Sequence, residues 1–262
     1  MNRKIIIALL LFCSCQKTVT LPLNTAPSQI VIQGEVTNAA GPYTVTINKS
    51  VGFYTDNTFP PISGAVVKIS DNQGNTDSLT ETFTPGVYTT HTLQGIPGNT
   101  YTLYVFAQDT AYTAVSTMPM PVNLDSVSFE ATTGFGKTRI SAEVNFQDPA
   151  GIHNYYQFIQ FINTVQFTKD IFIFDDRLSD GRYIVNDLRM DSTYIKPGDV
   201  VTVNMYCIDE NVYNYFNQIE QSSGNGAFNT TASPTNPATN ISNGAYGYFS
   251  AHTIQTKSAY VY

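Results

Sequence analysis

Four aspartates lie close together in the polar segment FTKDIFIFDDRLSDGRY, and such a group could bind a metal ion. They are Asp170, Asp175, Asp176 and Asp180. Carboxylates a few residues apart on a loop suit calcium, and Gly181 would allow a tight turn, although the spacing does not match the EF-hand loop. The calcium candidates of this sequence are therefore Asp175, Asp176 and Asp180.

The same segment also has the composition of a turn. Two of the aspartates stand directly before Arg177, and the Ser-Asp-Gly that follows is typical of a chain reversal ending at Arg182. The Asp-Pro-Ala-Gly that begins at Asp148 is likewise typical of a turn. We therefore expect a hairpin tip in the acidic segment, with no metal and no other cofactor.

Catalysis has no clear signature in the sequence. The histidines His91, His153 and His252 lie in different segments, and none has a His or Cys partner at a metal-ligand spacing. No GxSxG, HExxH or P-loop motif occurs. Cys207, in the apolar stretch VVTVNMYCI, is expected to be a small buried residue. We predict that the protein is not an enzyme. A hydrolase would require a pocket where a histidine meets an aspartate or a serine.

Tyrosine is the residue type that could serve binding. The chain has 17 Tyr and 16 Phe but no Trp. Exposed aromatic rings offer flat, partly apolar platforms to sugars, peptides and protein partners, whereas β-sandwiches also use Tyr for packing. The candidate ligand-binding residues are Tyr155, Tyr156, Tyr213, Tyr215, Tyr246 and Tyr248, and Tyr206 belongs to the same surplus.

The N-terminus has the layout of a secretory signal peptide. A basic start at Arg3 and Lys4 precedes an apolar run over residues 5–12, which is followed by Cys-Ser-Cys. The run is far shorter than the roughly 20 residues that a membrane-spanning helix needs. We therefore expect the leader to be cleaved rather than to stay as a membrane span.

The site of cleavage indicates a lipid anchor. A small residue must precede the cut, and Ser14 meets this condition for Cys15. Acyl chains on Cys15 would hold the protein on a membrane, because each buried methylene contributes about 0.8 kcal/mol. Residues 1–14 are thus the predicted signal peptide, and residues 15–29, which contain two prolines, are the lipidated cysteine and its tether.

Charge and composition limit the classes of partner. Removal of Arg3 and Lys4 with the leader takes the net charge from -7 to -9, which argues against nucleic acid and anionic lipid headgroups. Charged residues make up only 13% of the chain, while Tyr, Phe, Thr and Val favour strands. The sequence predicts an all-β protein with room for two domains.

Short alternating segments begin at Ile30. They read IVIQGEVTN, PYTVTINKS, AVVKISDNQG, GVYTTHTL and TYTLYVFAQ, with turn residues between them. This spacing is typical of a small antiparallel sandwich. Residues 63–105 resemble the transthyretin-like domain that regulates carboxypeptidases and precedes many TonB-dependent receptors. The resemblance implies an Ig-like or transthyretin-like β-sandwich over residues 30–120.

A second β-rich domain is expected over residues 121–262. Two prolines within residues 117–121 mark the boundary, because they cannot both lie inside a strand ladder. Further strand-like segments follow, and we expect the chain to end in a strand at residues 245–253 and a short one at residues 258–262.

One helix is expected in this domain, at residues 211–222. Its sequence is NVYNYFNQIEQS, in which Tyr213, Phe216 and Ile219 recur at a spacing close to that of a helix. Asp209 stands before it and is a suitable N-terminal cap. The aromatic stripe is expected to pack against the core.

Several segments spread along the chain resemble one known family. They are IVIQGEVTNAAGPYTVTINKS, GAVVKISDNQG, PGVYTT, IPGNTYTLYV, FDDRLSDGR, KPGDVVTV, YNYF and SPTNPATNISNGAYGYFSA. Together they resemble the outer-membrane lipoproteins of Bacteroidota that carry domain of unknown function 4249, over residues 15–262. The tether departs from the pattern, because it lacks the acidic residues that many relatives place after the lipidated cysteine.

The resemblance implies a function without site residues. Family members are commonly encoded beside TonB-dependent receptors, which implies a non-enzymatic outer-membrane accessory or binding partner of such a receptor in nutrient uptake or envelope assembly. Two alternatives stay open: a surface module that binds a glycan or peptide, and a hydrolase with an unrecognised site. The neutral tether leaves open whether the protein faces the cell surface or the periplasm, and the ligand and oligomeric state are equally open.

Overall fold

The computed structural model describes residues 27–52, 58–134, 136–190, 195–222 and 236–262. The predicted signal peptide, Cys15 and most of the tether lie outside these residues. The described chain is mostly β, with strands of alternating burial, so the predicted all-β class is confirmed. In the described ranges no helix is both long and apolar enough to cross a membrane.

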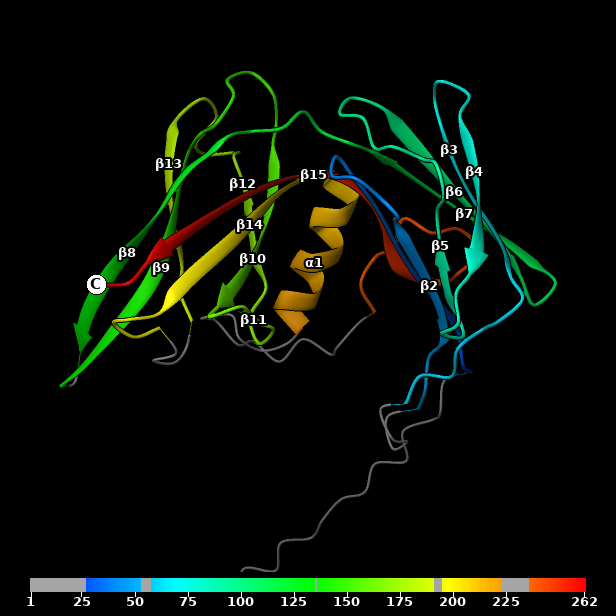
Figure 1. Cartoon of the computed structure of the whole chain (residues 1–262), viewed down its shortest axis with the longest axis horizontal. Helices are drawn as coiled ribbons and strands as arrows, with labels where there is room; N and C mark the ends of the chain where they lie inside the picture. Colours follow the sequence, from blue (N-terminus) through cyan, green and yellow to red (C-terminus); the bar gives the residue numbers. More distant parts are fainter. Residues whose placement is uncertain (1–26, 53–57, 135, 191–194, 223–235) are drawn as a thin grey trace, which may run out of the picture.

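Fifteen strands and one helix follow one another along the described residues (Figure 1). In the first half of the chain the strands are β1 (Ile30–Thr37), β2 (Thr44–Lys49), β3 (Val66–Asp71), β4 (Thr76–Glu81), β5 (Val87–Thr89), β6 (Thr100–Ala107) and β7 (Thr110–Thr117). The second half contains β8 (Leu124–Gly134), β9 (Lys137–Gln147), β10 (Tyr155–Ile162), β11 (Val165–Gln166), β12 (Phe172–Asp175), β13 (Tyr183–Leu188), β14 (Val200–Ile208), α1 (Glu210–Ser222) and β15 (Tyr246–Tyr260).

Two sheets hold these strands. The larger has twelve strands in the order β11-β10-β14-β15-β1-β2-β5-β4-β3-β6-β7, with β12 added beside β10. The smaller has the order β13-β9-β8. The two halves of the molecule lie side by side, and α1 fills the space between them (Figure 1). One continuous sheet therefore runs through both halves.

The strand that makes the sheet continuous is β15. Residues 246–252 pair in parallel with β1, and residues 253–260 pair antiparallel with β14. The sequence suggested two separate strands here, which was wrong. Polar residues between them, such as Thr256 opposite Asn204, continue the ladder instead of forming a turn. The C-terminal strand thus belongs to both halves at once.

Side chains of this strand enter the first core. Strands in the first half alternate buried and exposed residues, and their buried side chains meet inside that half. Phe249 and Ala251 of β15 join them, together with Ile241 and Ala245. The expected boundary at residue 120 therefore does not separate the two cores, because residues within 241–251 belong to the core of the first half. The second core lies between the small sheet and β10 and β14.

Helix α1 is placed by the residue expected to cap it. The Asp209 carboxylate accepts the Val212 N–H at 2.9 Å, and it also accepts the Ser116 hydroxyl of β7. Ser116 in turn accepts the Ala251 N–H of β15 at 2.8 Å. Val212 and Tyr215 are buried on the inner face of the helix. The predicted helix is confirmed, one residue longer at its start.

A substitution at Gly247 would test how much the pairing of β15 with β1 contributes to stability. Gly247 has a φ of +99°, and a Cβ there would overlap the carbonyl oxygen of Ile32 on β1. Gly247→Ala should lower the free energy of unfolding by about 3 kcal/mol, from overlap plus backbone strain. The measurement is urea unfolding. Gly134→Ala, where a Cβ meets nothing within 4 Å, is the control and should stay within about 0.5 kcal/mol of wild type. Equal stability of both variants would contradict this account.

Candidate functional site

Four of the six candidate tyrosines meet at α1. The rings of Tyr155 and Tyr213 lie 5.0 Å apart, and those of Tyr215 and Tyr248 lie 5.1 Å apart. Each pair joins the helix to a strand of the large sheet, and Phe216 adds a second ring against Tyr248 at 5.0 Å. None of the four is exposed. These rings hold the helix on the sheet and do not form an open platform.

The remaining two tyrosines lie elsewhere. Tyr156 is fully buried in the second core, and its hydroxyl donates to Asp148 at 2.5 Å. Burial raises the pKa of Tyr156 far above its usual value, and the Asp148 carboxylate raises it further. The half-buried Tyr246 accepts a hydrogen bond from the side-chain amide of Asn236 at 2.9 Å. The structure therefore separates both residues from the group at α1.

A pocket of about 370 Å³ lies on β1 and β2 beside this aromatic group. The hydroxyl of Tyr248 donates to the Glu35 carboxylate at 3.0 Å, and both residues line the pocket. Most of the lining residues carry a polar group: Gln33, Glu35, Thr37, Ala40, Pro42, Tyr43, Thr44, Thr46 and Tyr248. Sequence reasoning found Tyr248 but missed Glu35, which stands in a strand whose alternation alone could have shown it to face outward.

Three carboxylates meet in the second half, but they are not the predicted three. Oxygens of Asp148, Asp176 and Asp180 all lie within 4.8 Å of one another. Asp175 is not part of this group, because its carboxylate pairs with Arg177 at 3.0 Å and accepts the Tyr213 hydroxyl at 3.0 Å. Calcium takes six to eight oxygen ligands, so the trio could supply only part of a calcium site.

Two members of the trio are buried, and the pKa of one of them, Asp176, is shifted. Asp148 and Asp176 are each only 1% exposed. Burial raises the pKa of Asp176, the Asn154 N–H that it accepts lowers it, and the neighbouring Asp148 raises it again, so that the net shift is upward. His153 approaches Asp176 with Nε2 at 3.3 Å. The buried carboxylates are thus held mainly by hydrogen bonds, including the Gly181 N–H on Asp148 at 2.9 Å.

The acidic segment turns, as expected, but it is not a hairpin tip. The Ser179 N–H bonds the Asp176 carbonyl at 2.7 Å, and the Arg182 N–H bonds the Ser179 carbonyl at 3.0 Å. The strands on either side do not pair with each other, because β12 pairs with β10 and β13 pairs with β9. The segment therefore crosses from one sheet to the other, and that crossing brings Asp176 and Asp180 to Asp148.

Each histidine has a polar partner. His91 contacts Asp77 through Nδ1 at 3.2 Å and Thr80 through Nε2 at 3.0 Å. His252 contacts Ser250 through Nδ1 at 2.9 Å, and its Nε2 has no partner. Burial lowers the pKa of His252 to about 4, so its imidazole is neutral at pH 7.

A hydroxyl, an imidazole and a carboxylate are in contact in the order of a catalytic triad: Thr80, His91 and Asp77. Their surroundings are not those of an active site. Burial alone would raise the pKa of Asp77, but the N–H groups of residues 91–93 and the His91 ring lower it to about 2. The carboxylate thereby fastens the segment after β5. Thr80 lies on the exposed face of β4, and the pocket at Glu35 is not lined by a histidine.

The described chain has an all-β, sandwich-type fold. The sequence matches the family described as Domain of unknown function (DUF4249) over residues 16–258, and the chain belongs to this family. No curated protein matches the sequence. Among solved structures, a two fibronectin type-III domain segment from chicken tenascin is similar over 69% of this chain and 90% of that chain, with 13% identity and a TM-score of 0.23. The expected transthyretin-like type of the first half stays a prediction.

The contributions of Asp176 and Asp175 to the stability of the fold should change in opposite directions with pH. The folded pKa of Asp176 is raised, so its contribution to stability is present below the unfolded value of 3.8 and is lost as pH rises through the folded value. The folded pKa of Asp175 is lowered, because hydrogen bonds from Arg177 and Tyr213 outweigh burial; its contribution is present above 3.8 and is lost as pH falls.

Urea unfolding at pH 4 and pH 7 checks this. The free energy of unfolding of Asp176→Asn, taken relative to wild type, should be higher at pH 7 than at pH 4. For Asp175→Asn the same difference should be higher at pH 4 than at pH 7. Both variants are measured in a His153→Gln background, which removes the titration of the neighbouring imidazole. The same sign of pH dependence in both variants would contradict the assignment.

Proposed function

We propose that this protein is an outer-membrane lipoprotein, held by a lipid on Cys15, that acts as a non-enzymatic binding partner of a TonB-dependent receptor. The layout of the leader supports the anchor, and membership of the family supports the setting. A tether of residues 15–29 can extend to about 50 Å at 3.3 to 3.6 Å per residue. The folded body would therefore be free to reach a neighbouring membrane protein.

The observation that carries the proposal is an exposed apolar surface on β3, β6 and β7. Val66 is 48% exposed, Tyr104 36%, Phe106 41% and Val115 50%. We call these four residues the outer apolar face. Val66 stands directly opposite Phe106, and Thr102, two residues before Tyr104, stands opposite Val115, so all four side chains point away from the first core.

This face has the chemistry of a protein contact. Large contiguous apolar patches are rare on the surfaces of soluble monomers and often mark sites of protein interaction. Aromatic residues are enriched at the centres of such interfaces. Lys68 stands opposite Tyr104, and its charge would lie toward the rim of such a contact. A second protein is the partner that this surface fits best, since a flat sheet face offers no enclosure to a small molecule.

Replacing the aromatic residues of the outer apolar face should abolish the association. The double variant Tyr104→Ser/Phe106→Ser should fold, because both side chains are exposed, but should lose the receptor that the wild type retains in mild detergent. The measurement is affinity purification from solubilised membranes followed by identification of co-purified outer-membrane proteins. The variant should stay in the membrane fraction because Cys15 is unchanged.

The matched control lies on the other half. Tyr183→Ser/Val185→Ser changes two side chains on β13 that are more exposed, at 54% and 57%, and should retain the receptor. Purification of the wild type without any TonB-dependent receptor would contradict the proposal, and so would equal retention by both double variants.

Glycan binding is a second candidate function, favoured by the pocket at Glu35. Its carboxylate, amide and hydroxyl side chains are suited to sugar hydroxyls. Glu35→Gln should weaken binding of soluble oligosaccharides, measured by calorimetry, by about tenfold, because a charge-assisted hydrogen bond is lost. Asp109→Asn, in the turn between β6 and β7, is the control and should not change it. Equal affinity for both variants would contradict this role of the pocket.

A further inference from the structure

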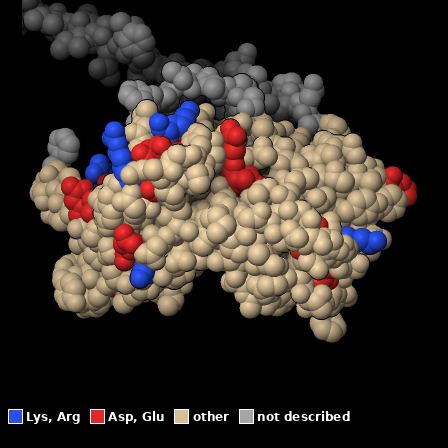
Figure 2. Space-filling view, turned by 90° about the horizontal axis from the view of Figure 1, so that it is seen from above, with Lys and Arg blue, Asp and Glu red and all other residues tan. Residues whose placement is uncertain are grey.

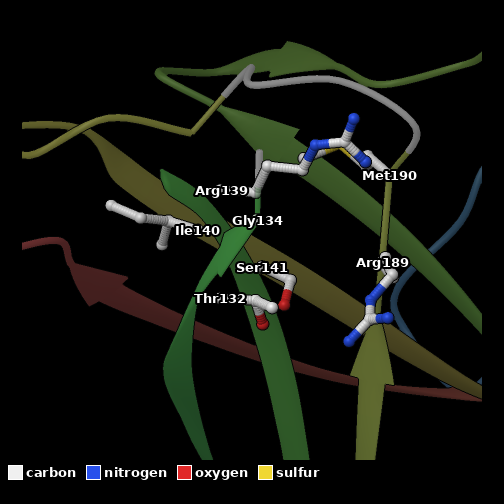
Figure 3. A pocket seen from close by; sticks show the side chains of 7 residues that line it. All are labelled: Thr132, Gly134, Arg139, Ile140, Ser141, Arg189 and Met190. Atoms are coloured by element: carbon white, nitrogen blue, oxygen red, sulfur yellow. The ribbon is translucent and has the colours of Figure 1, made fainter. Parts of the chain in front are cut away.

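A second pocket, of about 410 Å³, lies at the β8–β9 hairpin and the end of β13. The side chains that line it come from Thr132, Arg139, Ile140, Ser141, Arg189 and Met190, together with Gly134. Thr132 stands directly opposite Arg139 in the hairpin, so these two residues and Ser141 point to the same side of the sheet. Figure 3 shows the hydroxyls of Thr132 and Ser141 next to each other, with the guanidinium of Arg189 directed toward them.

The two arginines have unused hydrogen-bond donors. The side chain of Arg139 forms no ion pair or hydrogen bond with any residue that the structure describes. Arg189 contacts Asp187 through Nε at 3.1 Å, which leaves the two terminal nitrogens of its guanidinium without a partner in the same ranges. Both groups line one pocket. A guanidinium presents five N–H donors in a planar fork that matches a carboxylate.

One of the polar groups that line the pocket is a mostly buried hydroxyl. Ser141 is only 7% exposed, and Figure 3 shows its hydroxyl next to that of Thr132. A ligand that accepts a hydrogen bond from Ser141 would therefore lie close to the sheet.

Acidic residues outnumber basic ones in the second half of the chain, so a preference for an anion must come from the two arginines of the pocket itself. All four arginines of the described chain lie in the second half, and the basic side chains in Figure 2 gather mainly over that half. Three acidic residues share the sheet face, and one of them, Asp187, is the residue already paired with Arg189. Glu143 is directed away, because it accepts the Ser128 hydroxyl at 3.0 Å. Glu130 stands opposite Ser141 and would oppose an anion.

The rest of the lining is apolar. Met190 is 3% exposed and belongs to the second core, and Ile140 packs against the same core. An inorganic ion would leave these walls without a contact, whereas an organic acid would cover them. We propose that this pocket binds a small organic anion, in which a carboxylate on an apolar body pairs with Arg139 and Arg189, accepts the Ser141 hydroxyl and packs its body against Met190.

This site is independent of the proposed receptor contact. The outer apolar face lies on β3, β6 and β7, in the other half of the molecule. Loss of Arg139 should therefore leave co-purification with the receptor unchanged, so that failure of one proposal does not imply failure of the other.

Benzoate is a suitable probe, because its uncharged isostere benzamide has the same apolar body. Titration of the full-length, detergent-solubilised protein, measured by calorimetry, should show benzoate binding at least tenfold tighter than benzamide. Arg139→Gln, at an exposed side chain that should not affect folding, should weaken benzoate binding by about tenfold. Arg189→Gln should do the same, and Glu130→Gln should tighten binding because it removes a neighbouring negative charge.

Arg177→Gln is the matched control, since Arg177 lies in the same half but pairs with Asp175. It should leave benzoate binding unchanged. Equal binding of benzoate and benzamide would overturn the proposal, as would undiminished binding in Arg139→Gln or an equal loss in Arg177→Gln. Inorganic phosphate binding as tightly as benzoate would overturn the role of the apolar wall.

Discussion

The structure depends on the backbone ladder that β15 forms with two different strands. Its first part pairs with β1 and completes the first core, and its second part pairs with β14 beside the second core. Ser116 fixes the point between the two parts, because it accepts the Ala251 N–H and donates to Asp209, the cap of α1. The positions of both halves and of the helix are therefore set together.

Local patterns in the sequence predicted most elements but not how the halves join. Strand alternation and the cap at Asp209 are properties of neighbouring residues, so the all-β class and the helix could be predicted. The parallel pairing of β1 with β15 joins residues more than 200 positions apart, and no local periodicity encodes it. The acidic segment was expected to reverse within one sheet for the same reason: its composition showed a turn but not which strands the turn connects.

The candidate sites show the same limit. Residue type identified Tyr248, Asp176 and Asp180, but their neighbours Glu35 and Asp148 come from other segments. The arginine pocket was not predicted at all, because Arg139 and Arg189 are 50 positions apart and look like ordinary surface charges in the sequence. Tyrosine, in contrast, was abundant enough to suggest a binding platform, yet the structure uses four of the candidates to seat α1 on the sheet.

The parallel pairing of β1 also decides how the body would respond to mechanical load. The tether enters β1 at its first residue, and seven consecutive residue pairs, from Val31 to Thr37, join this strand to β15. A pull on the segment before β1, along the axis of this strand, would shear all of these pairs at once instead of opening them one after another. β2 holds the other side of the same strand. β1 is thus held on both sides, and tension applied through the proposed anchor would be shared between β15 and β2.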